Sequence, residues 1–306
     1  MKELTLAAQG EYCYTISPNN KPRLTVDPGE EVVVETEDAF SGQIRKNGDR
    51  RNLQSVPYPN PQSGPIYVNG AGKGDTLAVK IEDIQPLIGQ GATRIVSSWY
   101  PTKYDSALTN KFLGHEDVPH GTRICPIKDG KVHFGEFEIP YRPMIGTLST
   151  ADPDETYLSW LPGPHGGNMD LPQMSVGATV YLPVRIDGAL LHIGDIHAVQ
   201  GDGELSGAAV EMPARTRLKI DLLRNKPIEW PRLEDDSALY AIAATQAGRG
   251  LEDAMRLAFM NLILWLETDY DIDRWLAFEL LTLVSQVRIG NFWTVAVGMP
   301  KRYLRP

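Results

Sequence analysis

Apolar and polar residues alternate along several short stretches of the first 225 residues, which is the pattern of strands with one buried face. The examples are GDTLAVKIEDI (74–84) and KVHFGEFEIP (131–140), while GEEVVVETED (29–38) is predicted as a strand from its β-branched, apolar residues and RTRLKIDLL (215–223) is a further predicted strand. Between residues 178 and 199, two apolar runs flank Asp187-Gly188, a pair typical of tight turns, so this segment predicts a β-hairpin. Short strands with regular turns favour a β-sandwich or barrel.

The pattern changes near residue 248, where apolar residues begin to recur at the spacing of a helix. Leu262 and Trp265 belong to this apolar stripe, and we expect both to be buried. A second helical stretch follows DYDID, so an antiparallel helical hairpin is expected over roughly residues 250–287. FWTVAVGMP (292–300) then returns to a strand. The predicted fold is mainly β, sandwich- or barrel-like, with a C-terminal helical hairpin, which makes it a β-rich α+β protein.

No repeat, low-complexity tail or clear linker divides the 306 residues, so we expect a single unit. A subdivision would place an N-terminal β subdomain at residues 1–150 and a C-terminal α+β subdomain at residues 151–306. The proline-rich piece at residues 55–65 is too short to separate domains and is expected to be an ordered, extended loop.

Composition narrows the class of protein. The chain has 30 Lys and Arg against 39 Asp and Glu, and its net charge of −9 argues against binding to nucleic acids or to anionic membranes. Cys13 and Cys125 form neither a CxxC pair nor a disulfide framework. The sequence shows no signal-peptide pattern and no run of 18 apolar residues. We therefore expect a cytoplasmic protein.

The densest group of chemically active residues is HIGDIHAVQGDGE at residues 192–204. Asp195 and His197 are two apart on a predicted strand, so their side chains should share one side and supply part of a metal site. Gly201 and Gly203 allow a sharp turn that could bring Glu204 back toward them. A solvated β-turn is the alternative, but so many such groups close together favour a site.

A second group, LPGPHGGNMD (161–170), places His165, Asn168 and Asp170 among glycines. The backbone N–H groups of these glycines could face a ligand, although Asn and Asp in a long loop often bond only to their own backbone. Asp38 follows an apolar strand and, on composition alone, favours a structural role. His115, His120 and His133 are weaker candidates for a metal site.

These motifs resemble those of the acetamidase/formamidase family over nearly the whole chain. The resemblance is carried by GPHGGNMD, YLPVRIDGALLHIGDIHAVQGDGE, PQSGPIYVNGAGKGDTLAVKIEDI, RPMIGTLSTA and the late helical pair followed by MPK. It implies hydrolysis of a small aliphatic amide to a carboxylate and ammonia, a largely β fold, a cytoplasmic location and a homo-oligomer of two or more chains. Related proteins include zinc-containing amidases, some acting on cyclic amides, so a divalent metal, zinc before others, is expected.

The resemblance also implies roles for single residues. The expected metal ligands are Asp170, Asp195 and His197. The expected catalytic residues are Glu204, as general base and then acid, and Asp38, which would orient the amide nitrogen. Substrate contacts are expected from Asn168, His165 and Gln200. The chain departs from the family pattern in SQVRIGNF (285–292), which lacks the expected acidic residue before Arg288-Ile289, so a site group could be missing there.

Other classes of protein fit the sequence less well. It contains no G-x-S-x-G motif, Ser97-Ser98 and Lys73 are in the wrong order for a Ser-Ser-Lys amidase, and neither cysteine has a motif around it. GDIH after an apolar run suits a metallophosphoesterase, but the G-N-H-[DE] motif of that class is absent. A non-catalytic β-sandwich that binds a ligand and holds a structural metal is a further alternative. Metal-dependent turnover of formamide would separate these classes.

Overall fold

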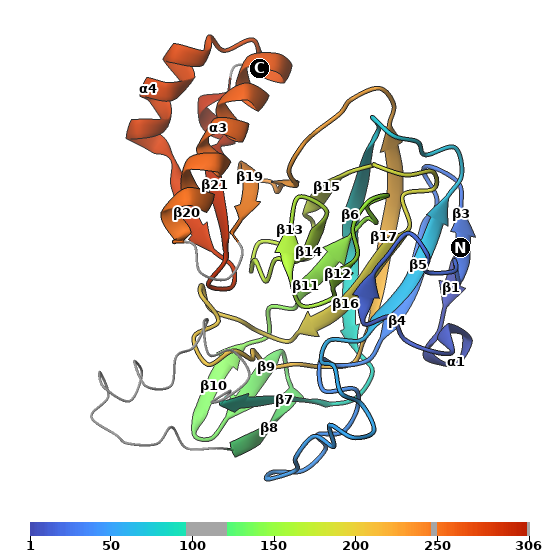
Figure 1. Ribbon diagram of the computed structural model, residues 1–306. Coiled ribbons are helices and arrows are strands. Elements are labelled where there is room, and N and C mark those ends of the chain that lie inside the picture. The colour runs from blue at the N-terminus through green and yellow to red at the C-terminus, as the bar shows by residue number, and fades with distance from the viewer. Residues whose placement is uncertain (96–120, 246–249, 305–306) are drawn as a thin grey trace.

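Two packed β-sheets and a C-terminal lobe with two helices make up the protein in a computed structural model that describes residues 1–95, 121–245 and 250–304 (Figure 1). The nine-stranded sheet has the order β1 (Lys2–Leu4), β4 (Glu31–Thr36), β17 (Ala214–Leu223), β6 (Thr76–Pro86), β15 (Thr179–Pro183), β18 (Arg232–Glu234), β19 (Ala238–Ala244), β21 (Thr294–Pro300) and β20 (Gln286–Ile289). The six-stranded sheet has the order β13 (Pro162–Gly163), β14 (Gly166–Asn168), β11 (Met144–Ser149), β16 (Leu191–His197), β5 (Gln62–Val68) and β3 (Leu24–Val26).

Smaller elements complete the described part of the chain. They are the four-stranded sheet β10 (Phe137–Pro140), β9 (Lys131–Phe134), β8 (Gly121–Lys128) and β7 (Gln90–Ile95), the pair β12 (Tyr157–Leu158) and β2 (Thr15–Ile16), and the helices α1 (Leu6–Gln9), α3 (Leu251–Tyr270), α4 (Arg274–Val284) and η1 (Lys301–Tyr303). None of the helices described is long and apolar enough to cross a membrane. Ser97, Ser98, His115 and His120 lie outside the described residues.

The two large sheets share one hydrophobic core, as expected of a sandwich. Their inward-facing residues, such as Val79 and Leu218 of the nine-stranded sheet and Ile145 and Ile193 of the six-stranded sheet, belong to one buried cluster. In β17 the buried positions alternate with more exposed ones, which is the period-two pattern seen in the sequence. All seven residues of β16 are buried because it lies inside the six-stranded sheet, between β11 and β5. The mainly β fold with a C-terminal helical pair is confirmed.

Strands from both halves of the sequence lie side by side in these sheets. In the nine-stranded sheet, β17 lies between β4 and β6, and in the six-stranded sheet β16 lies between β11 and β5. The division into subdomains at residue 150 stays a prediction. Strands that follow residue 150 pair with strands that precede it, and these pairings join the two halves.

The hairpin expected over residues 178–199 is wrong. A turn does form at Asp187-Gly188, but β15 pairs with β6 and β18, whereas β16 pairs with β11 and β5. The chain therefore crosses from one sheet to the other at this turn. The pattern of the sequence predicts strands correctly, but the pairing partner depends on the rest of the fold, since β16 is buried on both faces inside a sheet.

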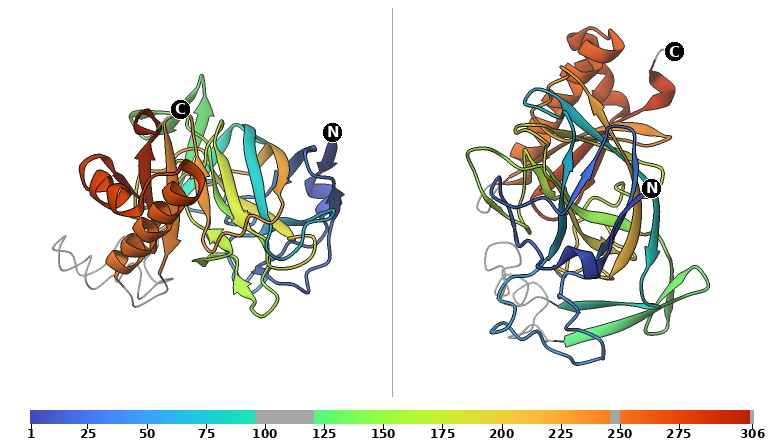
Figure 2. Two further views of the ribbon diagram at one scale, coloured as in Figure 1. Left: turned by 90° about the horizontal axis from the view of Figure 1, so that it is seen from above. Right: turned by 90° about the vertical axis from the view of Figure 1, so that its right-hand side faces the viewer.

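The helical hairpin is present but ends earlier than expected. The helix α3 runs from Leu251 to Tyr270 and α4 ends at Val284, after which Gln286–Ile289 pairs with β21 as an edge strand. Figure 2 shows the two helices beside β19 and β21, at one end of the molecule. Leu262 and Trp265 are buried against these strands, in a second hydrophobic cluster.

We expect Leu262→Ala to lower the free energy of unfolding by about 2–5 kcal/mol, because Leu262 is fully buried and the substitution leaves a cavity between α3 and the sheet. The matched control is Leu53→Ala in the loop before β5, where the residue is 48% exposed and the cost should stay within about 0.5 kcal/mol. Urea unfolding of both variants measures the difference. Equal losses would contradict this packing.

Candidate active site

Three neighbouring strands of the six-stranded sheet bring the expected metal ligands together. Asp195 and His197 lie at the end of β16, and Asp170 follows β14 on the other side of β11. Gly146 of β11 lies between them: a Cβ at this position would be 2.6 Å from Asp170 Oδ1 and 2.7 Å from Asp195 Oδ2. Only glycine leaves room for both carboxylates, so the sheet itself forms the base of the site.

Asp170, Asp195 and His197 form a compact, buried cluster. Each offers one ligand atom, and these atoms lie within 4.8 Å of one another. His197 Nε2 lies 3.4 Å from Asp195 Oδ1. The backbone at Asp170 and Asp195 is left-handed, with φ angles of 49° and 60°, a conformation that costs free energy for residues with a side chain. The grouping expected from the sequence is therefore present in the structure.

Gln200 fixes the orientation of His197. The side-chain oxygen of Gln200 lies 2.8 Å from His197 Nδ1, and its Nε2 donates to the backbone oxygen of Asp170 at 2.6 Å. Because an amide oxygen only accepts, His197 carries a proton on Nδ1 and directs Nε2 toward the carboxylates. Gln200 was expected to contact substrate, and the structure places it on the opposite side of the ring.

Glu211 is a fourth charged group of the cluster. Its Oε2 lies 3.0 Å from His197 Nε2, yet this approach lacks the geometry of a hydrogen bond, and neither atom has a hydrogen-bond partner among the described residues. Oε1 of Glu211 accepts from the backbone N–H of Ala209 at 2.9 Å. His197, Glu204 and Glu211 form a second trio whose ligand atoms lie within 4.8 Å of one another.

The electrostatics of this cluster favour a cation. Burial disfavours a charged imidazole, but the carboxylates of Glu211 and Asp195 outweigh it and raise the pKa of His197 well above its ordinary value. Burial, and then the charge of Glu211, raise the pKa of Asp195. Several carboxylates converging on one buried nitrogen can be stabilised by a proton or by a metal ion. The donor set of oxygen and imidazole nitrogen suits a divalent metal such as zinc.

Amide side chains hold the carboxylates in place. Asn168 Nδ2 donates to Asp170 Oδ2 at 2.7 Å, and Asn291 Nδ2 donates to the same oxygen at 2.8 Å. Asn60 Nδ2 lies 3.2 Å from Asn168 Oδ1 and 3.3 Å from Asp195 Oδ2. Asn168 was expected to contact the substrate; it lines a small cavity beside the cluster while it also binds Asp170.

The atypical segment 285–292 contributes to the site in its own way. Besides Asn291, the backbone oxygens of Ile289 and Gly290 accept from the N–H of Gly203 at 3.1 and 2.9 Å. Arg288 pairs with Asp202 at 3.4 Å. These contacts anchor the turn that carries Glu204. The segment contains no acidic residue, yet it holds both this turn and Asp170 of the buried cluster in place.

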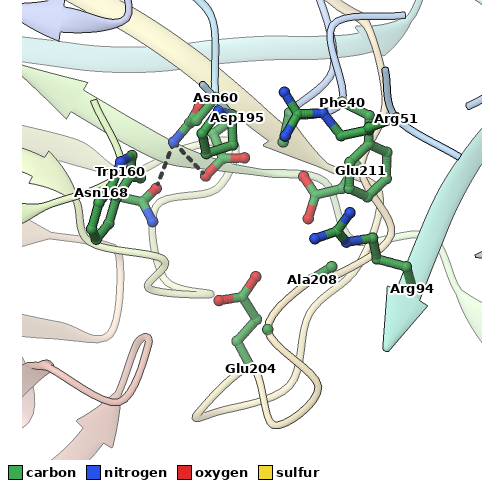
Figure 3. A pocket seen from close by; sticks show the side chains of 13 residues that line it. Phe40, Arg51, Asn60, Arg94, Trp160, Asn168, Asp195, Glu204, Ala208 and Glu211 are labelled. Carbon is green, nitrogen blue, oxygen red and sulfur yellow. Dashed lines mark hydrogen bonds between the residues drawn. The ribbon is translucent and has the colours of Figure 1, made fainter. Parts of the chain in front are cut away.

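The cavity beside the cluster has a volume of about 60 Å³ (Figure 3). Glu204 points into it from its turn, with a left-handed φ of 46°, opposite Asp195 and Asn60. The other principal lining residues are Phe40, Arg51, Arg94, Trp160, Asn168 and Glu211. Since one water needs roughly 10–15 Å³ by this measure, the enclosed part holds only a few non-hydrogen atoms.

Two expected site residues lie away from the lining of this cavity. The carboxylate of Asp38 accepts from Arg45 Nη1 at 2.5 Å and from the backbone N–H groups of Phe40 and Gly42, which stabilises the loop whose Phe40 lines the cavity. His165 is buried and stacks on Tyr157 with ring centroids 3.8 Å apart. Burial, more than neighbouring charges, lowers the pKa of His165 to about 3, so it is neutral.

Glu211, Asn60 and Asn291 were not predicted from the sequence. None of them belongs to a cluster with metal-ligand spacing. The sequence does contain one indication of Glu211. It is a single acidic residue between Ala208–Val210 and Met212, in an apolar stretch that is buried in the fold. Asn60 lies in the proline-rich loop and Asn291 next to Gly290, where composition suggests only turns.

Fold and site together define a class: strand-rich proteins with a carboxylate–histidine cluster buried beside a small polar cavity, an arrangement suited to metal-assisted hydrolysis. Within this class, the chain belongs to the acetamidase/formamidase family, whose model matches residues 12–161 and 160–247. The resemblance seen in the sequence is thereby confirmed.

Individual relatives agree with this family. An acetamidase of Mycolicibacterium smegmatis is 26% identical over 265 residues, which cover 68% of this chain and 64% of that protein. A formamidase of Methylophilus methylotrophus is 25% identical over 248 residues, which cover 65% and 61%. The match thus spans less than two thirds of the length of these curated relatives.

Solved structures match over more of their length. The crystal structure of an acetamidase from Yersinia enterocolitica has a TM-score of 0.91 at 38% identity, covering 100% of this chain and 94% of that one. An acetamidase from Bacillus halodurans has a TM-score of 0.86 at 30% identity, with 98% of each chain covered.

Proposed function

We propose that this protein hydrolyses a small aliphatic amide, similar to formamide or acetamide, to a carboxylate and ammonia. The observation that carries the proposal is the buried cluster of Asp170, Asp195 and His197 beside a cavity of about 60 Å³, in a chain of the acetamidase/formamidase family. The enclosed space suits a substrate of three or four non-hydrogen atoms, and a small lactam would need part of the open mouth.

We further propose that Asp170, Asp195 and His197 hold a divalent metal, with zinc as the first candidate. The fit rests on the converging oxygen and nitrogen atoms of the cluster, and on the contact from Gln200 that leaves Nε2 of His197 facing the carboxylates. When bound, such an ion would polarise the amide carbonyl and lower the pKa of water. The hydrogen bonds that Asn168 and Asn291 donate to Asp170 would keep this carboxylate oriented.

Glu204 is proposed as the general base that takes a proton from the attacking water and then passes it to the leaving nitrogen. It lines the cavity and is less buried than Asp195 or Glu211, so a substrate can reach it. Asn168 also lines the cavity and is proposed to contact the amide. The proposed part of Asp38 is indirect, through the loop that carries Phe40.

We also propose that the protein lies in the cytoplasm and forms a homo-oligomer of two or more chains. The oligomer is supported by an apolar face on the helical hairpin, where Trp275 is 70% and Leu283 is 81% exposed. Apolar side chains exposed to this extent on one face commonly mark a surface that another protein covers.

The test is a screen for ammonia release from formamide, acetamide and small lactams, run together with metal analysis of the purified protein. We expect turnover of at least one linear amide, loss of turnover after chelation and recovery with zinc. Full activity in rigorously metal-free protein would contradict the metal, whereas release from none of these amides would contradict amide hydrolysis. Turnover of a phosphate ester instead would indicate the metallophosphoesterase class.

A further inference from the structure

The two sides of the small cavity differ in character. Asn168, whose side-chain amide binds Asp170, lies with Trp160 on one side, and Phe40 and Ala208 lie on the opposite side (Figure 3). A small aliphatic amide also has two unlike ends, a polar amide group and an apolar acyl group. An amide group that contacts Asn168 therefore directs its acyl group toward Phe40 and Ala208.

Phe40 is held in a fixed position on its side of the cavity. It is 4% exposed and belongs to a buried hydrophobic cluster with Ile44, Ala92 and Ala208. Its backbone N–H donates to the carboxylate of Asp38 at 2.9 Å, which is the contact behind the indirect part proposed for that residue. A ring fixed both by its neighbours and by its backbone yields little to a longer acyl chain, because overpacking a close-packed region costs free energy.

The charged groups on this side of the cavity interact with other parts of the protein. Arg51 Nη2 donates to two backbone oxygens of its own loop, at 3.1 and 2.6 Å. The guanidinium carbon of Arg94 lies 5.6 Å from the centre of the Phe40 ring, in cation–π contact. Glu211 Oε2 lies 3.0 Å from His197 Nε2 and so belongs to the buried cluster. The apolar surface offered to an acyl group here is the aromatic ring and the alanine methyl group beside it.

We propose that Phe40 and Ala208 form the acyl wall of the cavity and determine which amides are hydrolysed. The preferred substrates are then formamide and acetamide, and longer linear amides are rejected because their acyl chains meet this wall. The enclosed volume of about 60 Å³ agrees, since it holds only a few non-hydrogen atoms. This inference rests on the proposed amide hydrolysis and deepens it by naming the residues that set the substrate class.

The experiment measures kcat/KM for formamide, acetamide, propionamide and butyramide. The wild-type protein should favour acetamide over butyramide, and Phe40→Ala should raise the ratio of butyramide to acetamide about 10- to 100-fold, because one methylene group alone changes the fit to a pocket by roughly 10- to 200-fold. Ala208→Val makes the opposite change. Its two additional methyl groups narrow the cavity and should lower the ratio of acetamide to formamide about 10-fold.

A purely structural role for Phe40 gives a different result. Its loss would then lower kcat/KM for all four amides by a similar factor and leave their ratios unchanged. Phe40→Leu keeps an apolar side chain of smaller volume, so it decides the question if Phe40→Ala does not fold. An unchanged ratio of butyramide to acetamide in a folded variant at position 40 would overturn the inference.

The matched control is Phe137→Ala, the same substitution on β10 of the small four-stranded sheet, where the residue is 60% exposed. It should leave all the ratios unchanged. Trp160→Leu tests the opposite side of the cavity. If Trp160→Leu admits butyramide while Phe40→Ala does not, the acyl group lies against Trp160, and the acyl wall as proposed is wrong.

NMR titration with acetamide and butyramide separates this inference from the proposed function. Turnover of acetamide with the same substrate ratios in every variant would leave amide hydrolysis standing and overturn the acyl wall. If no amide is hydrolysed, the same amides are stable ligands. Tighter binding of acetamide than of butyramide in the wild-type protein, lost in Phe40→Ala, then still supports the wall, whereas equal relative affinities in the two proteins count against it.

Discussion

Replacing His197 with alanine should strip the metal from the protein and reduce amide hydrolysis to the background rate, while the fold stays intact. The imidazole is central to the proposed metal site, because its Nε2 lies 3.0 Å from Glu211 and 3.4 Å from Asp195. Without it the remaining groups are carboxylates, which bind zinc less well than a mixed set and can take up protons instead. Asp195→Ala should have the same effect.

Metal content by mass spectrometry, ammonia release and circular dichroism measure these outcomes together. His133→Ala is the control, since His133 lies on β9, in the small four-stranded sheet, and should leave both metal and activity unchanged. Retention of metal and turnover in His197→Ala would remove this cluster from the mechanism.

Glu204→Gln should lower amide hydrolysis by roughly two to four orders of magnitude, the usual contribution of a positioned acid or base, while metal and substrate still bind. The amide keeps the shape of the side chain but cannot accept the proton of water. The turn should persist, because the N–H of Gly203 and the side chain of Asp202 anchor it to residues 288–290.

Glu211→Gln is the informative comparison, because Glu211 lines the same cavity and its Oε2 lies closer to His197 Nε2 than Asp195 Oδ1 does, at 3.0 Å against 3.4 Å. If Glu204 is the base, Glu211→Gln should weaken metal binding more than Glu204→Gln does. The reverse pattern, with metal lost in Glu204→Gln, would make Glu204 a ligand. Near-normal turnover in Glu204→Gln would show that Glu204 is not the general base and that the turn carrying it has only a structural role.

The fold was predictable wherever one face of a strand is buried. A β-branched, apolar run identified β4, alternation identified β6, and helical spacing identified α3 with its buried Leu262 and Trp265. Pairing was not predictable, because β16 is buried on both faces and its pattern is the same whether its neighbour is β15 or β11. The end of α4 was missed because Val287 follows Val284 at helical spacing, but hydrogen bonding to β21 makes Gln286–Ile289 a strand.

The candidate site was predictable where chemically active residues are close together in sequence. Asp195 and His197 are two apart on one strand, and Asp170 ends a glycine-rich motif. Glu211 and Asn291 reach the cluster only through the pairing and packing of distant segments, which local sequence does not encode. The position of Gln200 behind His197 likewise depends on how the chain turns after β16.

The left-handed backbone at Asp170, Asp195 and Glu204 has a consequence for laboratory evolution. Such a conformation costs a residue with a side chain roughly 1–3 kcal/mol, and glycine would relieve it at each position. Selection for expression yield or heat tolerance alone would therefore enrich glycine at these three positions and discard the carboxylates that we propose for catalysis. A library built on this protein needs turnover in the selection from the first round, because its best-folded members are expected to be among its least active.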